Sequence, residues 1–103
     1  MARVIKGSEF DAEVLQSKVP VLVDFFATWC PPCRALAPVI DEISGSGLIK
    51  VVKVDVDEAK DVSSKYRIFS VPTLMIFNSG KPADSKVGFS PRANLEAWIQ
   101  SKI

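Results

Sequence analysis

Phe25-Phe26-Ala27-Thr28-Trp29-Cys30-Pro31-Pro32-Cys33-Arg34-Ala35-Leu36 contains both cysteines of the chain, separated by two prolines. This stretch lies where an apolar, β-branched run gives way to a helical pattern that begins near residue 32. A cysteine at such a junction faces the unpaired N–H groups and the positive end of the helix dipole, which favour thiolate over thiol. Because the thiolate is the attacking species in disulfide exchange, the pattern predicts that Cys30 attacks and Cys33 resolves.

Spacing alone leaves two other interpretations of this cysteine pair open. One is a structural disulfide, although a bridge that closes so small a loop constrains the unfolded chain little. The other is half of a zinc site, but the chain has no further cysteine and no histidine, so four ligands would require a partner chain. A Cys-x-x-Cys pair near a β-α-β pattern is typical of redox sites, and this is the interpretation that we adopt.

The length, the charge and the N-terminal residues of the chain indicate which class of protein to expect. The 103 residues indicate one domain, residues 1–103, which is long enough to bury its own core. Thirteen basic and twelve acidic residues are scattered along the chain, so we expect neither nucleic-acid binding nor attachment to an anionic membrane. Residues 1–7 contain no long apolar region, which favours a cytoplasmic protein. In that reducing compartment, two cysteines favour transient catalytic use.

Hydrophobic periodicity and turn residues predict the elements in the order β-α-β-α-β-α-β-β-α, which corresponds to a mixed sheet with helices on both faces. The expected strands are residues 4–5, 21–27, 48–56, 74–77 and about 85–88, the last returning antiparallel after a turn at 78–81. The expected helices start at Ser8 as N-cap, near Pro32, at Asp57 and at Pro91 with Ser90 as N-cap. Pro38 should bend the second helix, and residues 45–47 should end it.

Asp24 is the one ionisable residue in the apolar run 21–27. A buried, unpaired carboxylate is costly, so we expect a raised pKa and a role as proton acceptor for a nearby thiol. Lys53, in the next predicted strand, either points outward or lies beside Asp24, and the sequence does not separate these two positions.

Several motifs in this order resemble the thioredoxin family over essentially the whole chain. They are Val23-Asp24-Phe25, Ala27-Thr28-Trp29-Cys30-Pro31-Pro32-Cys33-Arg34, Pro38, Val54-Asp55-Val56-Asp57, Val71-Pro72-Thr73, Asn78-Ser79-Gly80 and Gly88. The resemblance implies an α/β thioredoxin fold, with a central mixed β-sheet flanked by four helices and a dithiol at the surface. It also implies a cis Val71–Pro72 bond, with the backbone of Val71 beside the dithiol, where it pairs with an extended substrate segment.

The resemblance also assigns residues to roles. Cys30 would attack a substrate disulfide, Cys33 would resolve the mixed disulfide, and Asp24 with Lys53 would manage the proton of Cys33. The substrate would be received by a shallow apolar collar made of Trp29, Pro31, Pro32, Val71, Pro72, Gly88 and Phe89.

The function implied is reduction of protein disulfides, with no bound cofactor or metal, by a monomer that a reductase of the thioredoxin-reductase type recycles. Three alternatives remain: a disulfide oxidase or isomerase, a thioredoxin-fold module that binds a partner without turnover, and a metal or cluster shared between two chains.

Pro31 departs from the family pattern, in which Gly-Pro separates the two cysteines. Proline lacks an N–H and, before Pro32, is biased away from helical angles, so we expect a lost donor near the Cys30 sulfur and a stiffer turn. Because the family tunes its reduction potential through these two positions, we predict a potential somewhat more oxidising than about −270 mV, the thioredoxin value.

Overall fold

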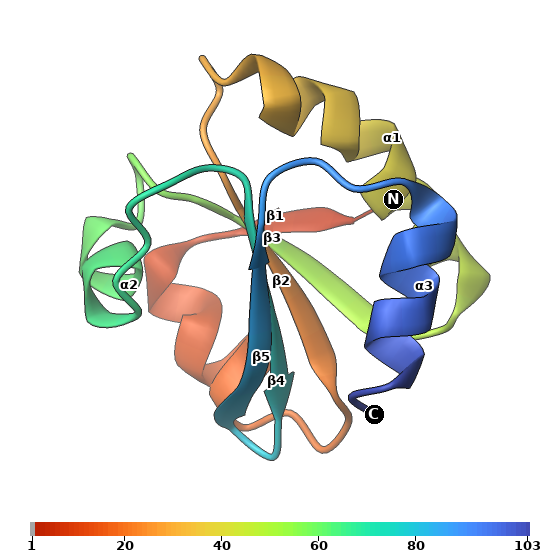
Figure 1. The fold of residues 1–103 in the computed structure, drawn as a ribbon. Coiled ribbons are helices and arrows are strands. Elements are labelled where there is room, and N and C mark those ends of the chain that lie inside the picture. Colours follow the sequence, from red (N-terminus) through yellow and green to blue (C-terminus); the bar gives the residue numbers. More distant parts are fainter. Residues whose placement is uncertain (1) are drawn as a thin grey trace.

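The computed structural model describes residues 2–103, in which five strands form one mixed sheet in the order β1-β3-β2-β4-β5 (Figure 1). The strands are β1 (Arg3–Ile5), β2 (Val21–Phe26), β3 (Lys50–Asp55), β4 (Thr73–Asn78) and β5 (Lys81–Val87). β1 and β2 pair parallel with β3, whereas β4 pairs antiparallel with both β2 and β5. The predicted mixed sheet and the antiparallel return of the last strand are therefore confirmed.

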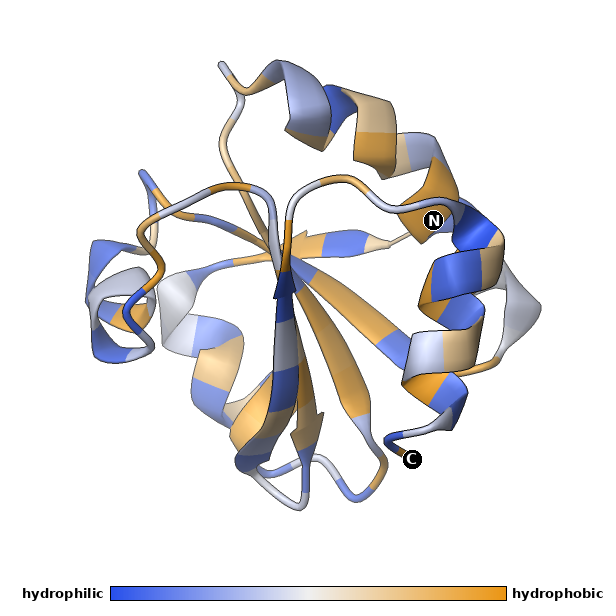
Figure 2. Cartoon of the chain, in the orientation of Figure 1, coloured by the Kyte–Doolittle hydropathy of each residue, from blue (hydrophilic) through white to orange (hydrophobic). Residues whose placement is uncertain are grey.

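Helical segments cover both faces of this sheet (Figure 1). α1 (Pro31–Ser46) and α3 (Arg92–Gln100) lie on one face, and α2 (Lys60–Lys65) lies on the other with the short turns η1 (Gly7–Glu9) and η2 (Asp11–Leu15). Each face buries its own apolar cluster, and Figure 2 shows apolar residues concentrated along the central strands. Within residues 2–103, none of the helices has the length and apolar character needed to cross a membrane.

β2 is buried on both faces, as its continuous apolar sequence predicts. Val23 and Phe25 belong to the core beneath α2, and Leu22 belongs to the core beneath α1. Because side chains alternate along a strand, Asp24 lies on the same face as Leu22, the face that α1 covers. The strand therefore carries its one carboxyl group into the layer that also holds the cysteines.

The first helical segment differs from the predicted Ser8-capped α-helix. Its N-cap is Lys6, whose N–H donates to the Glu9 carboxylate at 2.8 Å, and the first turn tightens to a 3₁₀ helix. The next turn widens to a π-helix, in which the Gln16 N–H donates to the Asp11 carbonyl at 2.9 Å. Local hydrogen bonds, one to a side chain and one within the backbone, thus accompany a helical pitch that apolar spacing alone does not predict.

Two other helices begin later than predicted. Asp57 does not open α2, because its N–H donates to the Asp55 carboxylate at 2.9 Å and the chain turns before the helix starts. Pro91 is the N-cap of α3 rather than its first residue, since its backbone is extended, with ψ at 155°. Its carbonyl accepts the Leu95 N–H at 3.0 Å, and the predicted cap, Ser90, is buried instead.

The end of α1 agrees with the predicted stop at residues 45–47, whereas β5 begins earlier than predicted. α1 continues through Pro38 and Gly45 and ends at Gly47, which has a φ of +76°. A left-handed residue stops the helix there, and glycine adopts that conformation without the steric cost of a Cβ. β5 begins four residues earlier than expected, at Lys81, because the hairpin turn is only the pair Ser79 and Gly80, both with positive φ.

Candidate active site

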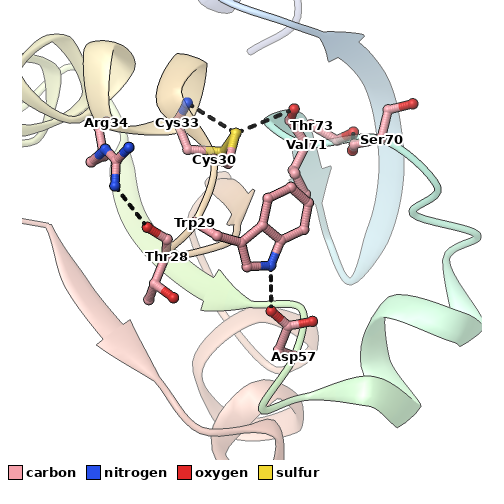
Figure 3. Close-up of a disulfide and its surroundings, with 9 residues drawn as sticks. All are labelled: Thr28, Trp29, Cys30, Cys33, Arg34, Asp57, Ser70, Val71 and Thr73. Carbon is pink, nitrogen blue, oxygen red and sulfur yellow. Dashed lines mark hydrogen bonds between the residues drawn. A yellow bond between two sulfur atoms is a disulfide. The ribbon is translucent and has the colours of Figure 1, made fainter.

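The two cysteines lie at the junction of β2 and α1 and form a disulfide (Figure 3). Their Cα atoms are 5.2 Å apart. Cys30 is the N-cap of α1, and Cys33 lies in its first turn, with its N–H donating to the Cys30 sulfur at 3.2 Å. This is the position predicted from sequence, and it directs the positive end of the helix onto Cys30 rather than Cys33.

Pro31 and Pro32 occupy the first two positions of α1, where neither supplies an N–H. Cys33 at the third position is therefore the first residue of α1 with a backbone donor. An N-cap side chain bonds to the second or third N–H of a helix, so the first position, Pro31, is not the one that reaches the Cys30 sulfur. We expected Pro31 to remove an N–H donor from the Cys30 sulfur. A backbone N–H at position 31 would not normally reach that sulfur, so its absence removes no hydrogen bond there.

The Val71–Pro72 loop faces the disulfide, and its peptide bond is cis, as predicted. The Val71 carbonyl oxygen lies 3.6 Å from the Cys30 sulfur (Figure 3). The Pro72 carbonyl accepts the N–H of Gly88 at 2.8 Å, which joins this loop to the end of β5. Phe89 follows and is half exposed. The structure thus joins three of the predicted collar residues, Val71, Pro72 and Gly88, next to Cys30.

Trp29 directly precedes Cys30 in the chain and is 65% exposed. Its Nε1–H donates to the Asp57 carboxylate at 2.9 Å, which fixes the ring beside the disulfide (Figure 3). The sequence pattern indicates Asp57 only as a helix start and does not predict this contact. The signal was present, because Asp57 follows β3 and Trp29 follows β2, and the carboxyl ends of two paired parallel strands meet at one edge of a sheet.

Asp24 is 1% exposed in the middle of β2. Burial raises its pKa to about 6, although the charge of Lys53 acts in the opposite direction. Within residues 2–103, its Oδ1 atom has no hydrogen-bond partner. The predicted rise in the pKa is confirmed, and the group titrates close to neutral pH.

Lys53 lies beside Asp24, because these two residues are register partners in the parallel pair β2–β3. Its ammonium group is 4.7 Å from the centre of the Phe26 ring. Lys53 also lines a pocket of about 250 Å³ that Cys33 and Arg34 border. The sequence left two positions open for Lys53, and the structure has the one beside the Asp24 carboxyl group, near Cys33.

The side chains of the described residues were compared with the ligand groups that a metal ion requires. Among residues 2–103, no three cysteine, histidine, aspartate or glutamate side chains are grouped so that they could hold a metal ion.

A mixed sheet that presents a Cys-x-x-Cys disulfide at a helix N-terminus defines the class of thiol-disulfide oxidoreductases. The thioredoxin family model matches residues 1–101. The chain is 46% identical over 105 residues to the thioredoxin of Rickettsia felis, covering 100% of both chains. It is 50% identical over 104 residues to thioredoxin 1 of Nostoc sp., covering 99% of this chain and 97% of that protein. Thioredoxin 1 of Synechococcus elongatus is also 50% identical, over 105 residues that cover 100% and 98%.

The chain therefore belongs to the thioredoxin family, and its fold is the thioredoxin fold. It is a protein-disulfide reductase that uses the Cys30–Cys33 pair. Thioredoxins act on disulfide substrates and are recycled by a reductase.

Proposed function

We propose that Cys30 is the nucleophile and Cys33 the resolving thiol of this reductase. The Cys30 thiolate attacks one sulfur of a substrate disulfide, which breaks that bond and releases the other sulfur as a thiolate. The Cys33 thiolate then attacks the Cys30 sulfur of the mixed disulfide, which closes the Cys30–Cys33 bond and frees the reduced substrate. The observation that carries this order is the Cys33 N–H donated to the Cys30 sulfur at 3.2 Å.

The proposal assigns Asp24 and Lys53 to the proton of Cys33. The Cys33 thiol must lose its proton before it attacks, and a carboxylate with a pKa of about 6 is largely ionised at neutral pH and able to accept one. Lys53 borders the same pocket as Cys33 and favours the charged form of Asp24. Support comes from this shared location and from the burial of Asp24.

The substrate surface in this proposal is the apolar collar around Cys30. An extended substrate segment lies against the backbone of Val71, whose carbonyl is 3.6 Å from the attacking sulfur. The exposed aromatic rings of Trp29 and Phe89 belong to this collar. The remaining contacts of the collar come from Pro31, Pro32, Pro72 and Gly88. A small apolar collar suits many different disulfides with modest affinity.

The chain completes its cycle as a monomer in the cytoplasm, where a reductase of the thioredoxin-reductase type returns the disulfide to the dithiol. Its thioredoxin relatives support the need for such an enzyme. The second candidate function is disulfide oxidation or isomerisation, which Pro31 favours because it stands where the family has glycine.

Replacing Cys33 with Ser tests the roles of the two cysteines. We expect Cys33→Ser to lose turnover and to accumulate a mixed disulfide with a protein substrate, because nothing then releases Cys30. Mass spectrometry after proteolysis identifies the linked cysteine. The matched variant Cys30→Ser should form no such adduct.

Trapping through Cys33 in the Cys30→Ser variant, at the rate seen for Cys33→Ser, would reverse the proposed roles. Unchanged partner binding by Cys33→Ser, with no covalent adduct, would favour a module that binds without turnover.

A further inference from the structure

Phe69 is the most exposed of the large apolar side chains in residues 2–103, at 88%. It precedes β4 in the loop that follows α2. Single exposed apolar residues are common on protein surfaces, whereas adjacent ones mark a binding surface. Val87, which is 63% exposed, lies with Phe69 on the border of one open groove of about 230 Å³.

Strand pairing and a loop hydrogen bond hold these two side chains at the same groove. Val87 is the register partner of Thr73 at the start of β4. The Thr73 hydroxyl donates to the Ser70 carbonyl at 2.6 Å, which ties the loop next to Phe69 to that strand (Figure 3). β5 is an edge strand of the sheet, so no further strand of the described chain covers its outer side.

This groove lies next to the proposed collar, because Val87 directly precedes Gly88, whose N–H donates to the Pro72 carbonyl at 2.8 Å. Phe69 is two residues from Val71, and two residues of extended chain span at most about 7 Å. The Val71 carbonyl is itself 3.6 Å from the Cys30 sulfur. A substrate strand advances about 3.3 Å per residue. A side chain two or three residues from the reacting cysteine is therefore the part of a substrate that reaches Phe69.

We propose that Phe69 and Val87 form an apolar subsite that binds an aliphatic or aromatic side chain of the substrate, two or three residues from its reacting cysteine. The inference rests on the proposed function and makes Phe69 a specificity-determining residue for it. The occupant is substrate rather than a second copy of the chain, because Phe69 and Val87 lie within two residues of Val71 and Gly88, the collar residues at which the substrate is proposed to bind.

Two symmetric peptide disulfides test this subsite. Each is a dimer of one short peptide joined through its central cysteine, with leucine in one dimer and serine in the other at positions two and three on both sides. The reduced protein reacts with each dimer in a stopped-flow experiment that follows tryptophan fluorescence. Hydroxyethyl disulfide, which has no such side chains, serves as the reference substrate.

We expect the native chain to reduce the leucine dimer about tenfold faster than the serine dimer, since burying part of an aliphatic side chain supplies a factor of this size. Phe69→Ser should remove most of that preference and leave the rate with hydroxyethyl disulfide within about twofold of the native value. Val87→Thr should reduce the preference by a smaller factor. The control Val19→Ser alters a 54% exposed residue before β2, at the end of that strand away from Cys30, and should retain the preference.

Three results would overturn the subsite. The first is an unchanged leucine preference in Phe69→Ser, and the second is an equal loss of rate with all three disulfides. The third is a native chain that sediments as a dimer and a Phe69→Ser variant that sediments as a monomer, with equal rates for the two peptides, which would assign the groove to self-association. A native chain that reduces none of the three disulfides would contradict the proposed function itself, and the subsite with it.

Discussion

Asp24 is the residue at which stability and chemistry conflict most directly. Burial raises the pKa of its carboxyl group from 3.8 to about 6, so the folded chain binds a proton more tightly than the unfolded chain does. Between about pH 4 and pH 6 the unfolded state therefore binds fewer protons, and the free energy of unfolding falls as the pH rises. Above pH 6 this contribution is fully lost, and a shift of about two units corresponds to roughly 3 kcal/mol.

Asp24→Asn should remove this dependence on pH, because the amide has no proton to lose. We expect the stability of the variant relative to the native chain to increase by about 3 kcal/mol between pH 4 and pH 7. Urea unfolding of the oxidised protein at pH 4, 5, 6 and 7 measures it. The exposed Glu58→Gln is the control and should follow the native profile. Parallel profiles for native chain and Asp24→Asn would show that Asp24 does not titrate as described.

At the scale of single residues, Asp24 could be identified from the sequence, because it is the one ionisable residue in the apolar run 21–27. The position of Lys53 depends on which residues of β2 and β3 are partners, and that register is a property of the sheet. Asp57 was missed for the same reason, since its bond to Trp29 joins two loops 28 residues apart. Side-chain contacts between strands are set by pairing, which residue types and spacing do not contain.

α1 is the element that controls the reactive sulfur, and its two ends were predictable to different degrees. The N-cap position of Cys30 follows from proline in the first turn, a strong local signal. The effect of Pro31 was harder to predict, because only the structure identifies Cys33 as the residue whose N–H meets the sulfur. The C-terminal end depended on which of two nearby glycines is left-handed, and the sequence does not distinguish them.

Two glycine replacements at the C-terminal end of α1 test this assignment. Gly47→Ala should destabilise the chain by about 1 kcal/mol, because alanine is strained at a φ of +76°. Gly45→Ala, inside the helix, should stabilise it by about 0.5–1 kcal/mol. An added Cβ meets no atom within 4 Å at either position, so the two differ in backbone conformation alone. Thermal or urea unfolding measures both, and equal effects of the two variants would contradict the left-handed cap.

At the scale of the whole molecule, the order of strands and helices could be predicted well, because each long apolar segment has the period of its element. The sheet order β1-β3-β2-β4-β5 was not predicted, because periodicity does not specify which strands are neighbours. The pitch of residues 7–15 could not be predicted, since single hydrogen bonds decide between α, 3₁₀ and π turns there.

The central claim is that Cys30 and Cys33 cycle between dithiol and disulfide at a potential suited to reducing proteins. The most direct test is the equilibrium of the pair in glutathione buffers, followed by the fluorescence of Trp29, which lies beside Cys30. We predict one two-electron transition somewhat above about −270 mV and below about −200 mV. A value at or below about −270 mV would refute the predicted effect of Pro31 alone. A potential between about −180 and −120 mV, where isomerases and strong oxidants lie, or no transition at all, would contradict the reductase account.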